Sequence, residues 1–372
     1  MTATKASRFL RLAKRIVVPG LAAVALASSM AQPADKPPES QALLLGQFKS
    51  QPMLKVPENL VERSKFPCID FHGHLARMKP EETIAIMDDC NVKLFVDFDG
   101  RWGEILEKQK AKYRRWPGRV IHFTRIPWRF INEPDFSERA VKSLEESVKA
   151  GARGLKVSKA LGLYVREKDG KLIAVNDPRL DPVWAKCGEL GIPVAIHVAD
   201  PDAFFLPLDG RNEQYEALVR NPLWRFYGKD FPSKDTLLEQ RNDVIGRHPG
   251  TTFVGLHVAN RPENLAEVAA LLDRYPNLHV EFGARLNELG RQPYTARDFF
   301  LKYSDRILFG IDRGSMSRFQ YRVYFRFLES RDEYFHHGSG LGRWRIYGIH
   351  LPDDVLKKVY YKNAAKLLGL DE

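Results

Sequence analysis

Two histidines near residue 70 have the spacing of a metal chelate. His72 and His74 stand two residues apart at the end of a short apolar stretch that predicts a β-strand. Side chains alternate between the faces of a strand, so both imidazoles would point to the same side, and Gly73 leaves room there for a close approach. Imidazole nitrogens suit Zn, Fe, Ni or Mn better than Mg or Ca. An isolated pair of this kind is also compatible with surface or loop histidines.

Three later apolar runs end in a polar residue that could bind a metal. The runs before His197 and His257 have the pattern of buried strands that stop on histidine, and the run that begins at Arg306 stops on Asp312. In a parallel barrel the carboxyl ends of the strands meet on one face, where active sites lie. We therefore expect these side chains to converge with the histidine pair at one rim of a barrel.

Eight strand-like segments, each followed by a helical pattern, support that architecture. The predicted strands cover residues 67–72, 93–98, 119–125, 152–158, 192–198, 252–258, 278–283 and 306–311. Helical patterns include residues 81–90, 136–150, 182–190, 262–275 and 352–368. The strands are rich in Val, Ile, Leu and Phe without clean alternation, as parallel strands buried on both faces are.

The predicted fold class is therefore α/β, a single-domain (β/α)8 TIM barrel over residues 61–372. An open, doubly wound sheet is the competing fold, but no glycine-rich nucleotide fingerprint follows the first strand. Two connections are long and aromatic, residues 200–232 after the fifth strand and residues 313–351 after the eighth. These loops could line a cleft, cover the site, form a subunit interface or simply pack against the barrel.

The order and spacing of these motifs resemble the amidohydrolase-related metal-dependent hydrolases of the amidohydrolase superfamily, in the branch that includes aminocarboxymuconate-semialdehyde decarboxylase-like enzymes. The resemblance covers roughly residues 66–370. The motifs that carry it are DFHGH at 70–74, GLK at 154–156, IH at 196–197, LH at 256–257, RILFGID at 306–312 and NAAKLLGL at 363–370.

This resemblance implies a cofactor and a ligand set. It implies that His72, His74, His197 and Asp312 hold one divalent metal ion, with Zn2+ the first choice, and that His257 stands beside the metal. Such a site leaves a coordination position for water and lowers the pKa of that water to about 7. Asp312 can then accept the proton of the water and pass it to the leaving group. His257 can polarise the substrate carbonyl or stabilise an oxyanion, and a purely structural histidine is the alternative.

Four basic residues are candidate substrate-binding groups. Lys156 lies on the predicted fourth strand, where several branches of the superfamily have a carbamylated lysine that bridges two metals. The branch that this chain most resembles works with one metal, so we expect an ordinary lysine or one that binds substrate. Arg261, Arg285 and Arg313 follow the sixth, seventh and eighth strands and would suit an anionic substrate if they point inward. Solvated surface arginines are the alternative.

The first 31 residues have the layout of a secretory signal peptide. Five basic residues precede an apolar segment at 16–27, and Ser29-Met30-Ala31 is a small-x-small cleavage site. The apolar segment is short of the ~20 residues that span a bilayer, so no stable membrane span is expected. Residues 32–60 are predicted to be a linker. We therefore expect an exported protein, periplasmic or secreted.

Composition and net charge indicate which classes of partner to expect. The formal net charge is +11, from 58 Lys and Arg residues against 47 Asp and Glu residues, and five of the positive charges lie in the predicted signal peptide. Basic residues do not interleave with aromatic ones in a stripe, so nucleic acid is not an expected partner. The three cysteines have no CxxC spacing and imply no disulfide framework. The oligomeric state stays open.

The sequence thus predicts an exported, metal-dependent hydrolase that uses a metal-activated water on a small-molecule substrate, anionic if the arginines face it. The bond cleaved would be the C–N or C–O bond of an amide, cyclic amide, ester or lactone. A metal-dependent, non-oxidative decarboxylase on the same fold is the first alternative, because no motif separates the two. A catalytically inactive extracytoplasmic binding barrel is a further alternative, but it predicts a broken ligand set, whereas all four expected ligands are present.

Overall fold

The computed structural model describes residues 43, 44, 46–314 and 316–370. The chain divides into two units, Met1–Leu54 and Lys55–Glu372. In the first unit the backbone N–H of Gln47 donates to the carbonyl of Leu44 at 2.8 Å, which makes a turn. The predicted signal peptide, residues 1–31, and residues 32–42 of the predicted linker lie outside the described residues, so both remain predictions.

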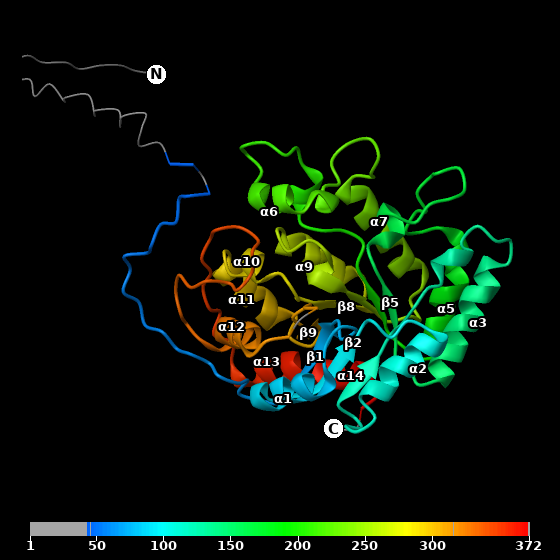
Figure 1. Ribbon diagram of the computed structural model, residues 1–372, viewed down its shortest axis with the longest axis horizontal. Coiled ribbons are helices and arrows are strands. Elements are labelled where there is room, and N and C mark those ends of the chain that lie inside the picture. Colours follow the sequence, from blue (N-terminus) through cyan, green and yellow to red (C-terminus); the bar gives the residue numbers. More distant parts are fainter. Residues whose placement is uncertain (1–42, 45, 315, 371–372) are drawn as a thin grey trace, which may run out of the picture. The chain divides into compact units, whose positions relative to one another are not determined.

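Parallel strands form the centre of the second unit (Figure 1). Neighbouring strands are hydrogen-bonded in chain order, in two groups that run from β1 to β3 and from β4 to β9. All of these pairs are parallel. The strands are β1 (Cys68–Gly73), β2 (Val92–Asp97), β3 (Val120–His122), β4 (Thr124–Arg125), β5 (Leu155–Val157), β6 (Val194–Ile196), β7 (Phe253–Gly255), β8 (Leu278–Glu281) and β9 (Ile307–Leu308).

β3 and β4 together are the predicted third strand. They are separated only by Phe123, whose N–H donates to the carbonyl of Asp97 at 3.0 Å on the β2 side. The N–H of Thr124 donates to the carbonyl of Gly154 at 2.8 Å on the β5 side. The two groups of strands therefore join through one bent strand.

The last strand also joins the first. The N–H of Phe71 in β1 donates to the carbonyl of Phe309 at 2.9 Å, and the N–H of Asp312 donates to the carbonyl of His72 at 2.8 Å. These bonds close the set of eight strands into a ring, as the (β/α)8 prediction requires. The chain has the predicted α/β fold with a parallel sheet.

A helix follows each of the eight strands along the chain, and the helices surround the strands (Figure 1). These helices are α1 (Pro80–Cys90), α2 (Gly103–Lys112), α3 (Phe136–Lys149), α5 (Asp181–Glu189), α7 (Lys234–Arg247), α9 (Leu265–Arg274), α11 (Pro293–Lys302) and the C-terminal series α13 (Asp353–Lys357), η6 (Lys358–Lys362, a π-helix) and α14 (Asn363–Leu367). Further elements in the connections are η2 (Trp128–Phe130), α4 (Ala160–Leu163), η3 (Pro178–Leu180), η4 (Asp202–Phe205), α6 (Tyr215–Arg220), η5 (Pro222–Trp224), α8 (Leu256–Ala259), α10 (Leu286–Leu289) and α12 (Arg318–Glu329).

Local sequence explains where these helices begin and end. α1 has Pro80 in its first turn and stops at Asn91, which has the left-handed φ of 63° that terminates many helices. α9 begins at Leu265, three residues after its predicted start, because the side chain of Asn264 caps the helix by accepting the N–H of Glu267. The other predicted helices agree with the structure to within a residue or two at most boundaries.

The sheet is buried on both faces. Alternate strand residues such as Ile69, Leu94 and Val254 form one apolar cluster, which α14 joins through its alanines. Their strand neighbours, such as Cys68, pack in a larger cluster with the surrounding helices. This two-sided burial explains why the strand segments lack the polar alternation of a half-exposed sheet.

The two long connections follow the fifth and the eighth strand, as predicted. The connection after β6 contains η4, α6 and η5, and the one after β9 contains α12. No helix among the described residues combines the length and hydropathy that crossing a membrane requires.

Candidate metal and catalytic site

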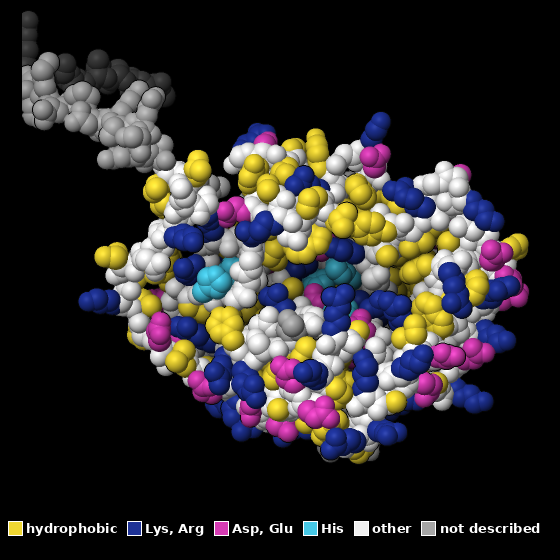
Figure 2. Space-filling model, in the orientation of Figure 1, with side chains coloured by type: hydrophobic (Ala, Val, Ile, Leu, Met, Phe, Trp, Pro, Cys, Tyr) yellow, Lys and Arg dark blue, Asp and Glu magenta, His cyan; other side chains and the backbone are white. Residues whose placement is uncertain are grey.

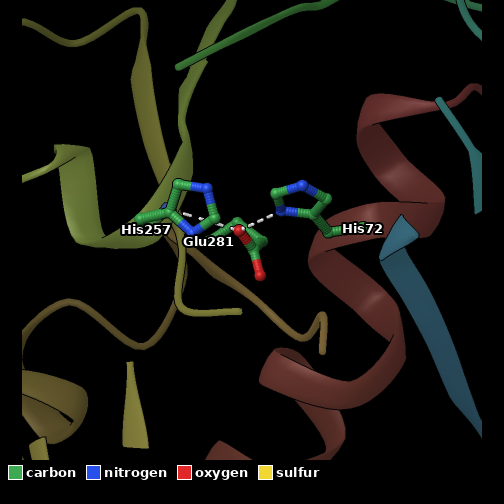
Figure 3. Close-up of side chains that lie close together, drawn as sticks. All are labelled: His72, His257 and Glu281. Carbon is green, nitrogen blue, oxygen red and sulfur yellow. Dashed lines mark hydrogen bonds and ion pairs between the residues drawn. The ribbon is translucent and has the colours of Figure 1, made fainter. Parts of the chain in front are cut away.

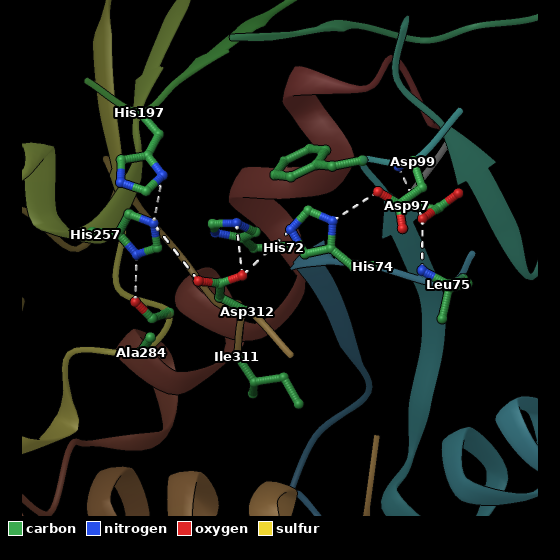
Figure 4. Close-up of polar contacts among 12 residues, drawn as sticks. His72, His74, Leu75, Asp97, Asp99, His197, His257, Ala284, Ile311 and Asp312 are labelled. Carbon is green, nitrogen blue, oxygen red and sulfur yellow. Dashed lines mark hydrogen bonds and ion pairs between the residues drawn. The ribbon is translucent and has the colours of Figure 1, made fainter. Parts of the chain in front are cut away.

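The histidine pair at the end of β1 is held by two carboxylates, that of Glu281 on His72 (Figure 3) and that of Asp99 on His74 (Figure 4). Nδ1 of His72 lies 2.8 Å from Glu281 Oε2, and Nδ1 of His74 lies 2.9 Å from Asp99 Oδ1. Nε2 of His72 lies 3.3 Å from Asp312 Oδ1, and Nε2 of His74 lies 3.5 Å from the same oxygen. A carboxylate on Nδ1 fixes the orientation of a ring and leaves Nε2 as the available ligand atom. Both rings are therefore arranged as metal ligands are.

His257 faces the same carboxylate from the other side. Its Nδ1 lies 2.8 Å from the carbonyl oxygen of Gly283, and its Nε2 lies 3.7 Å from Asp312 Oδ2. A carbonyl can only accept, so Nδ1 carries the proton. Burial lowers the pKa of His257 well below its usual value, and the Arg285 guanidinium lowers it further. The ring is therefore neutral, with a lone pair on Nε2.

His197 contacts His257 and not Asp312. Nδ1 of His197 lies 3.3 Å from Nε2 of His257. Since that Nε2 holds a lone pair, Nδ1 of His197 must be the donor. Burial lowers the pKa of His197 to about 4, although Asp200 acts in the opposite direction, so the ring is neutral. Its Nε2 lies 3.4 Å from Asp200 Oδ1. The prediction that His197 binds a metal is not tested by these contacts.

The ligand atoms around Asp312 have the separations of a coordination shell. With zinc–ligand distances of about 2.0–2.1 Å, tetrahedral ligand atoms are about 3.3 Å apart. The separations from Asp312 Oδ1 to His72 and His74, 3.3 and 3.5 Å, agree with that length. The residues present therefore fit one divalent ion.

A second group of possible ligands consists of His72, His257 and Glu281 (Figure 3). Here Glu281 Oε2 lies only 2.8 Å from His72 Nδ1, and it also accepts the backbone N–H of His257 at 3.4 Å. The shorter distance is a hydrogen-bond length and leaves no room for an ion between the two atoms. Glu281 thus serves to orient the two histidines.

The charges of the site suit a cation. Burial raises the pKa of Asp312, but the nearby histidines, His72 foremost, outweigh burial and hold that pKa well below its usual range. Burial lowers the pKa of His74, but its bonds to Asp312 and Asp99 outweigh it and raise the pKa to about 9. His74 therefore carries a proton between two carboxylates until a metal takes that proton's place on Nε2.

Lys156 lies beneath the site on β5. Its Nζ has no hydrogen-bond partner among the described residues and lies 4.6 Å from the ring centre of Phe98. Burial lowers the pKa of Lys156 to about 7, although the Asp312 carboxylate acts in the opposite direction. The side chain is not among the residues that line the cavity described next, and its role in substrate binding stays a prediction.

A cavity of about 400 Å³ opens over His257 and Asp312. Figure 2 shows histidine side chains in a hollow at the centre of this face, with basic side chains beside it. Both long connections contribute to the wall, so lining a cleft, one of the alternatives left open by the sequence, is what the structure shows. The residues that line the cavity are Lys159, His197, Asp200, Pro201, Phe204, Ala217, Arg220, Asn221, Trp224, His257, Ala284, Arg285, Asp312, Arg313, Ser339, Gly340 and Leu341.

The structure brings two of the three predicted arginines to the cavity. Arg285 is 4% exposed, its Nη2 lies 3.7 Å from Asp200 Oδ1, and its Nε has no partner among the described residues. Arg313 also lines the cavity.

Arg261 lies elsewhere. It is ion-paired with three carboxylates and does not line the cavity. Its partners are Asp202 at 3.2 Å, Glu267 at 2.8 Å and Asp235. The substrate-binding role of Arg261 stays a prediction.

Two carboxylates of the site escaped sequence reasoning. They are Glu281 and Asp99. Both stand at or just after the carboxyl end of a strand, β8 and β2. Polar residues at the carboxyl ends of strands were the signal that identified the histidines. The same signal identifies these two carboxylates once an acidic residue is also considered as a hydrogen-bond partner of a metal-binding histidine.

The backbone is strained where His257 and Asp312 stand. His257, Val258, Ala259 and Asn260 have successive φ values of 57°, 56°, 49° and 56°, and Asp312 has 52°. Each such residue costs roughly 1–2 kcal/mol when it is not glycine. The sixth strand was predicted to continue to residue 258, which is wrong, because β7 ends at Gly255 and this left-handed turn, residues 257–260, follows.

Comparisons with known proteins agree with this architecture. A family model described as "Amidohydrolase" matches residues 69–370. An uncharacterised TIM-barrel protein of Bordetella bronchiseptica is structurally similar, with a TM-score of 0.53 and 19% identity over 82% of this chain and 99% of that chain. A zinc-bound amidohydrolase of Burkholderia multivorans has a TM-score of 0.49 and 13% identity over 82% of this chain and all of the other, 100%. A dihydroorotase of Campylobacter jejuni has a TM-score of 0.49 and 14% identity, over 85% and 88%. No curated protein matches the chain.

Proposed function

The chain belongs to the amidohydrolase family, and from that premise we propose that it is a metal-dependent hydrolase that cleaves the C–N or C–O bond of an amide, cyclic amide, ester or lactone. The observation that carries this proposal is the convergence of three imidazole Nε2 atoms, from His72, His74 and His257, on the carboxylate of Asp312. These residues come from three different strand ends of one rim, and a purely structural role would not need such a donor set.

One divalent ion, with Zn2+ the first choice, would be held by His72, His74 and Asp312. A further nitrogen would come from the His197–His257 pair, with His197 the predicted ligand. When bound, the ion supplies the Lewis acidity that makes water a nucleophile near neutral pH.

The protein's own residues would handle protons and orientation. Asp312 is the group that accepts a proton from the attacking water and returns it to the leaving group. Its carboxylate is ionised because the histidines hold its pKa low. His257 presents a lone pair on Nε2, so we propose that it is a proton acceptor. The role of oxyanion donor expected from the sequence would first require that this ring be protonated.

The substrate would be a small anionic molecule. Four basic side chains line the cavity, Lys159, Arg220, Arg285 and Arg313, against the two carboxylates of Asp200 and Asp312. Trp224 and Phe204 stack on one another in the same wall, with ring centres 5.8 Å apart. An apolar wall with a few basic groups suits a flat carbonyl compound that carries a carboxylate.

The test combines metal analysis with a substrate screen. The purified protein should contain close to one equivalent of a divalent metal. Amides, esters, lactones and aromatic carboxylic acids should be screened for hydrolysis and, in parallel, for release of CO2. Hydrolysis without CO2 supports the proposal. Release of CO2 would replace it with the alternative, a metal-dependent non-oxidative decarboxylase, which the basic cavity would also suit. A metal-free protein without either activity would favour the binding barrel.

A further inference from the structure

The left-handed turn, residues 257–260, brings His257 back over the end of β7. Gly255 makes this possible, because a Cβ at that position would lie 2.9 Å from the Cβ of Ala259. Val258 is β-branched, and such residues are the least suited to a positive φ. Four successive residues with a positive φ persist only where surrounding contacts hold them. The contacts that hold the turn are therefore part of what places the imidazole.

Two side chains hold the turn in place, that of Asn260 from within the turn and that of Arg241 from α7. The side-chain amide of Asn260 donates to the carbonyl of Ala199 at 2.6 Å, and its oxygen accepts the N–H of Val198 at 3.2 Å. These bonds tie the turn to the segment after β6. From the opposite direction, the guanidinium of Arg241 on α7 donates to the carbonyl of Ala259 in the middle of the turn.

Burying the charged side chain of Arg241 at this place costs free energy. It is wholly buried, and no ion pair with a carboxylate is present among the described residues. Its acceptors are the carbonyl of Ala259 and the side-chain oxygen of Asn242, which it meets at 2.8 and 3.2 Å. Burial lowers the pKa of Arg241 to about 9. Methionine or leucine would fill the space without burying a charge, so the useful property of Arg241 is the bond to the turn.

We propose that Arg241 is a positioning residue, which holds the carbonyl of Ala259 and thereby keeps Nε2 of His257 directed at the carboxylate of Asp312. The residue touches neither substrate nor metal ligands and acts through the left-handed turn. The proposal rests on the proposed function only for the chemical use of His257. The placement of the imidazole can be tested without any activity.

The first test uses imidazole nitrogen resonances of the metal-free, full-length protein labelled with 15N-histidine. The resonances of His257 are identified by their loss in His257→Gln. In Arg241→Met, which keeps the volume, they should shift or broaden. The matched control is Arg247→Gln on the same helix, whose guanidinium binds Asp181 and Asp243 at the surface, and it should leave them unchanged. Unchanged resonances in Arg241→Met, or equal changes in both variants, would overturn the proposal.

A second substitution separates holding the turn from general packing. Glycine adopts a positive φ without strain, so Val258→Gly should make the turn less dependent on Arg241. In the double variant with Arg241→Met, the His257 resonances should move back toward those of the wild type. No such movement would show that Arg241 acts by packing, and would overturn the proposal. If Arg241→Met does not fold, Arg241→Lys with and without Val258→Gly gives the same comparison.

Kinetics add a third readout once the substrate screen has supplied a substrate. Misplacing a catalytic group by about 1 Å can cost about 10²-fold in rate. Arg241→Met should therefore lower kcat by about that factor while KM changes less than about twofold, and Arg247→Gln should leave both unchanged. An unchanged kcat in Arg241→Met would overturn the proposal. If the screen finds no substrate, the proposed function fails, but the resonance tests still decide on Arg241.

Discussion

At the scale of single residues, the backbone of Asp312 makes a clean substitution possible. Its φ of 52° is a conformation that asparagine also tolerates. Asp312→Asn therefore removes the charge and keeps the volume and the turn. We expect kcat to fall by about 10²–10⁴-fold, the range for loss of a general acid–base group, while the metal-free variant and the metal-free wild type should have similar thermal unfolding midpoints. Steady-state kinetics and calorimetry check both, and unchanged activity would remove Asp312 from the mechanism.

The carboxylate of Glu281 orients two histidines at once, and an amide cannot replace it. Its oxygens accept three donors, from His72 Nδ1 and from the backbone N–H groups of His257 and Gly283. In Glu281→Gln the amide nitrogen must face one of these donors. We expect the affinity for Zn2+ to fall about 10- to 100-fold, as for other residues that orient metal ligands. Competition with a chromophoric chelator measures this, and Glu239→Gln on the surface of α7 is the control; equal affinities would contradict the role of Glu281.

The residue scale also shows how far a sequence can be read. His72 and His74 could be predicted because strand alternation is local and needs no partner. Glu281 lies 209 positions from His72, and their contact exists only because the ring of strands closes. Arg261 and Arg285 each follow a strand end by a few residues, and the sequence does not show which carboxylates the fold brings near each of them.

At the scale of elements, the ends of β8 and β9 have glycines because Glu281 needs the space. A Cβ at Gly310 would lie 2.5 Å from Glu281 Oε1 and 2.8 Å from the Cβ of His72. Gly310→Ala should therefore destabilise the fold by about 1–3 kcal/mol, the usual cost of overpacking, and should also weaken zinc binding. Gly210→Ala is the control, because nothing lies within 4 Å of its Cβ position. Equal unfolding free energies in urea for both variants would contradict this account of Gly310.

The short helix α10 has a buried carboxyl whose oxygens lack partners among the described residues. Burial raises the pKa of Glu288 from 4.5 to about 7. The folded state thus keeps a proton that the unfolded state releases, so stability falls as pH rises from about 4.5 to about 7. Glu288→Gln should remove this decline. Across that pH range its free energy of unfolding should increasingly exceed that of the wild type, by up to about 3 kcal/mol. Urea unfolding at several pH values measures it; parallel profiles for the two proteins would show that the shift is absent.

Element boundaries were predictable where a local signal exists. Pro80 near the start of α1 and the apolar runs of the strands are such signals. The end of β7 was not predictable, because Gly255 and His257 have the pattern of a continuing strand. The left-handed turn depends on contacts with other segments, made by Arg241 of α7 and by the side chain of Asn260 to the segment after β6. The strain is visible only when those contacts are known.

At the scale of the whole molecule, the fold class and the use of both long connections followed from the order of segments. Eight apolar runs separated by helical patterns admit few arrangements, and a parallel ring is the one that buries both faces of each strand. The substrate could not be predicted in the same way. The cavity wall combines Arg220 and Trp224 of one connection with Leu341 of the other, and no local rule relates two loops to one another.

Metal binding should stabilise the whole barrel. An ion that binds only the folded state at 100 times its dissociation constant adds about 2.7 kcal/mol. For a domain of this size 1 kcal/mol shifts the unfolding midpoint by roughly 2–4 °C. Removal of the metal with a chelator should therefore lower the midpoint by about 5–10 °C and abolish turnover, and added Zn2+ should restore both. A midpoint that does not respond would mean that the ligands do not bind an ion in the folded protein.

The number of ions bound decides the place of Lys156 in this site. With one ion, Lys156 is a buried amine beneath the ligands, and Lys156→Met should leave the zinc stoichiometry at about one. With two ions, a carbamylated Lys156 would be the natural bridge, because its Nζ has no other partner among the described residues, and Lys156→Met should then lose zinc. Elemental analysis of both proteins, with an intact-mass measurement for the added carboxyl, distinguishes the cases. We expect one ion and an unmodified lysine, since His72, His74 and Asp312 already complete most of a single tetrahedral shell.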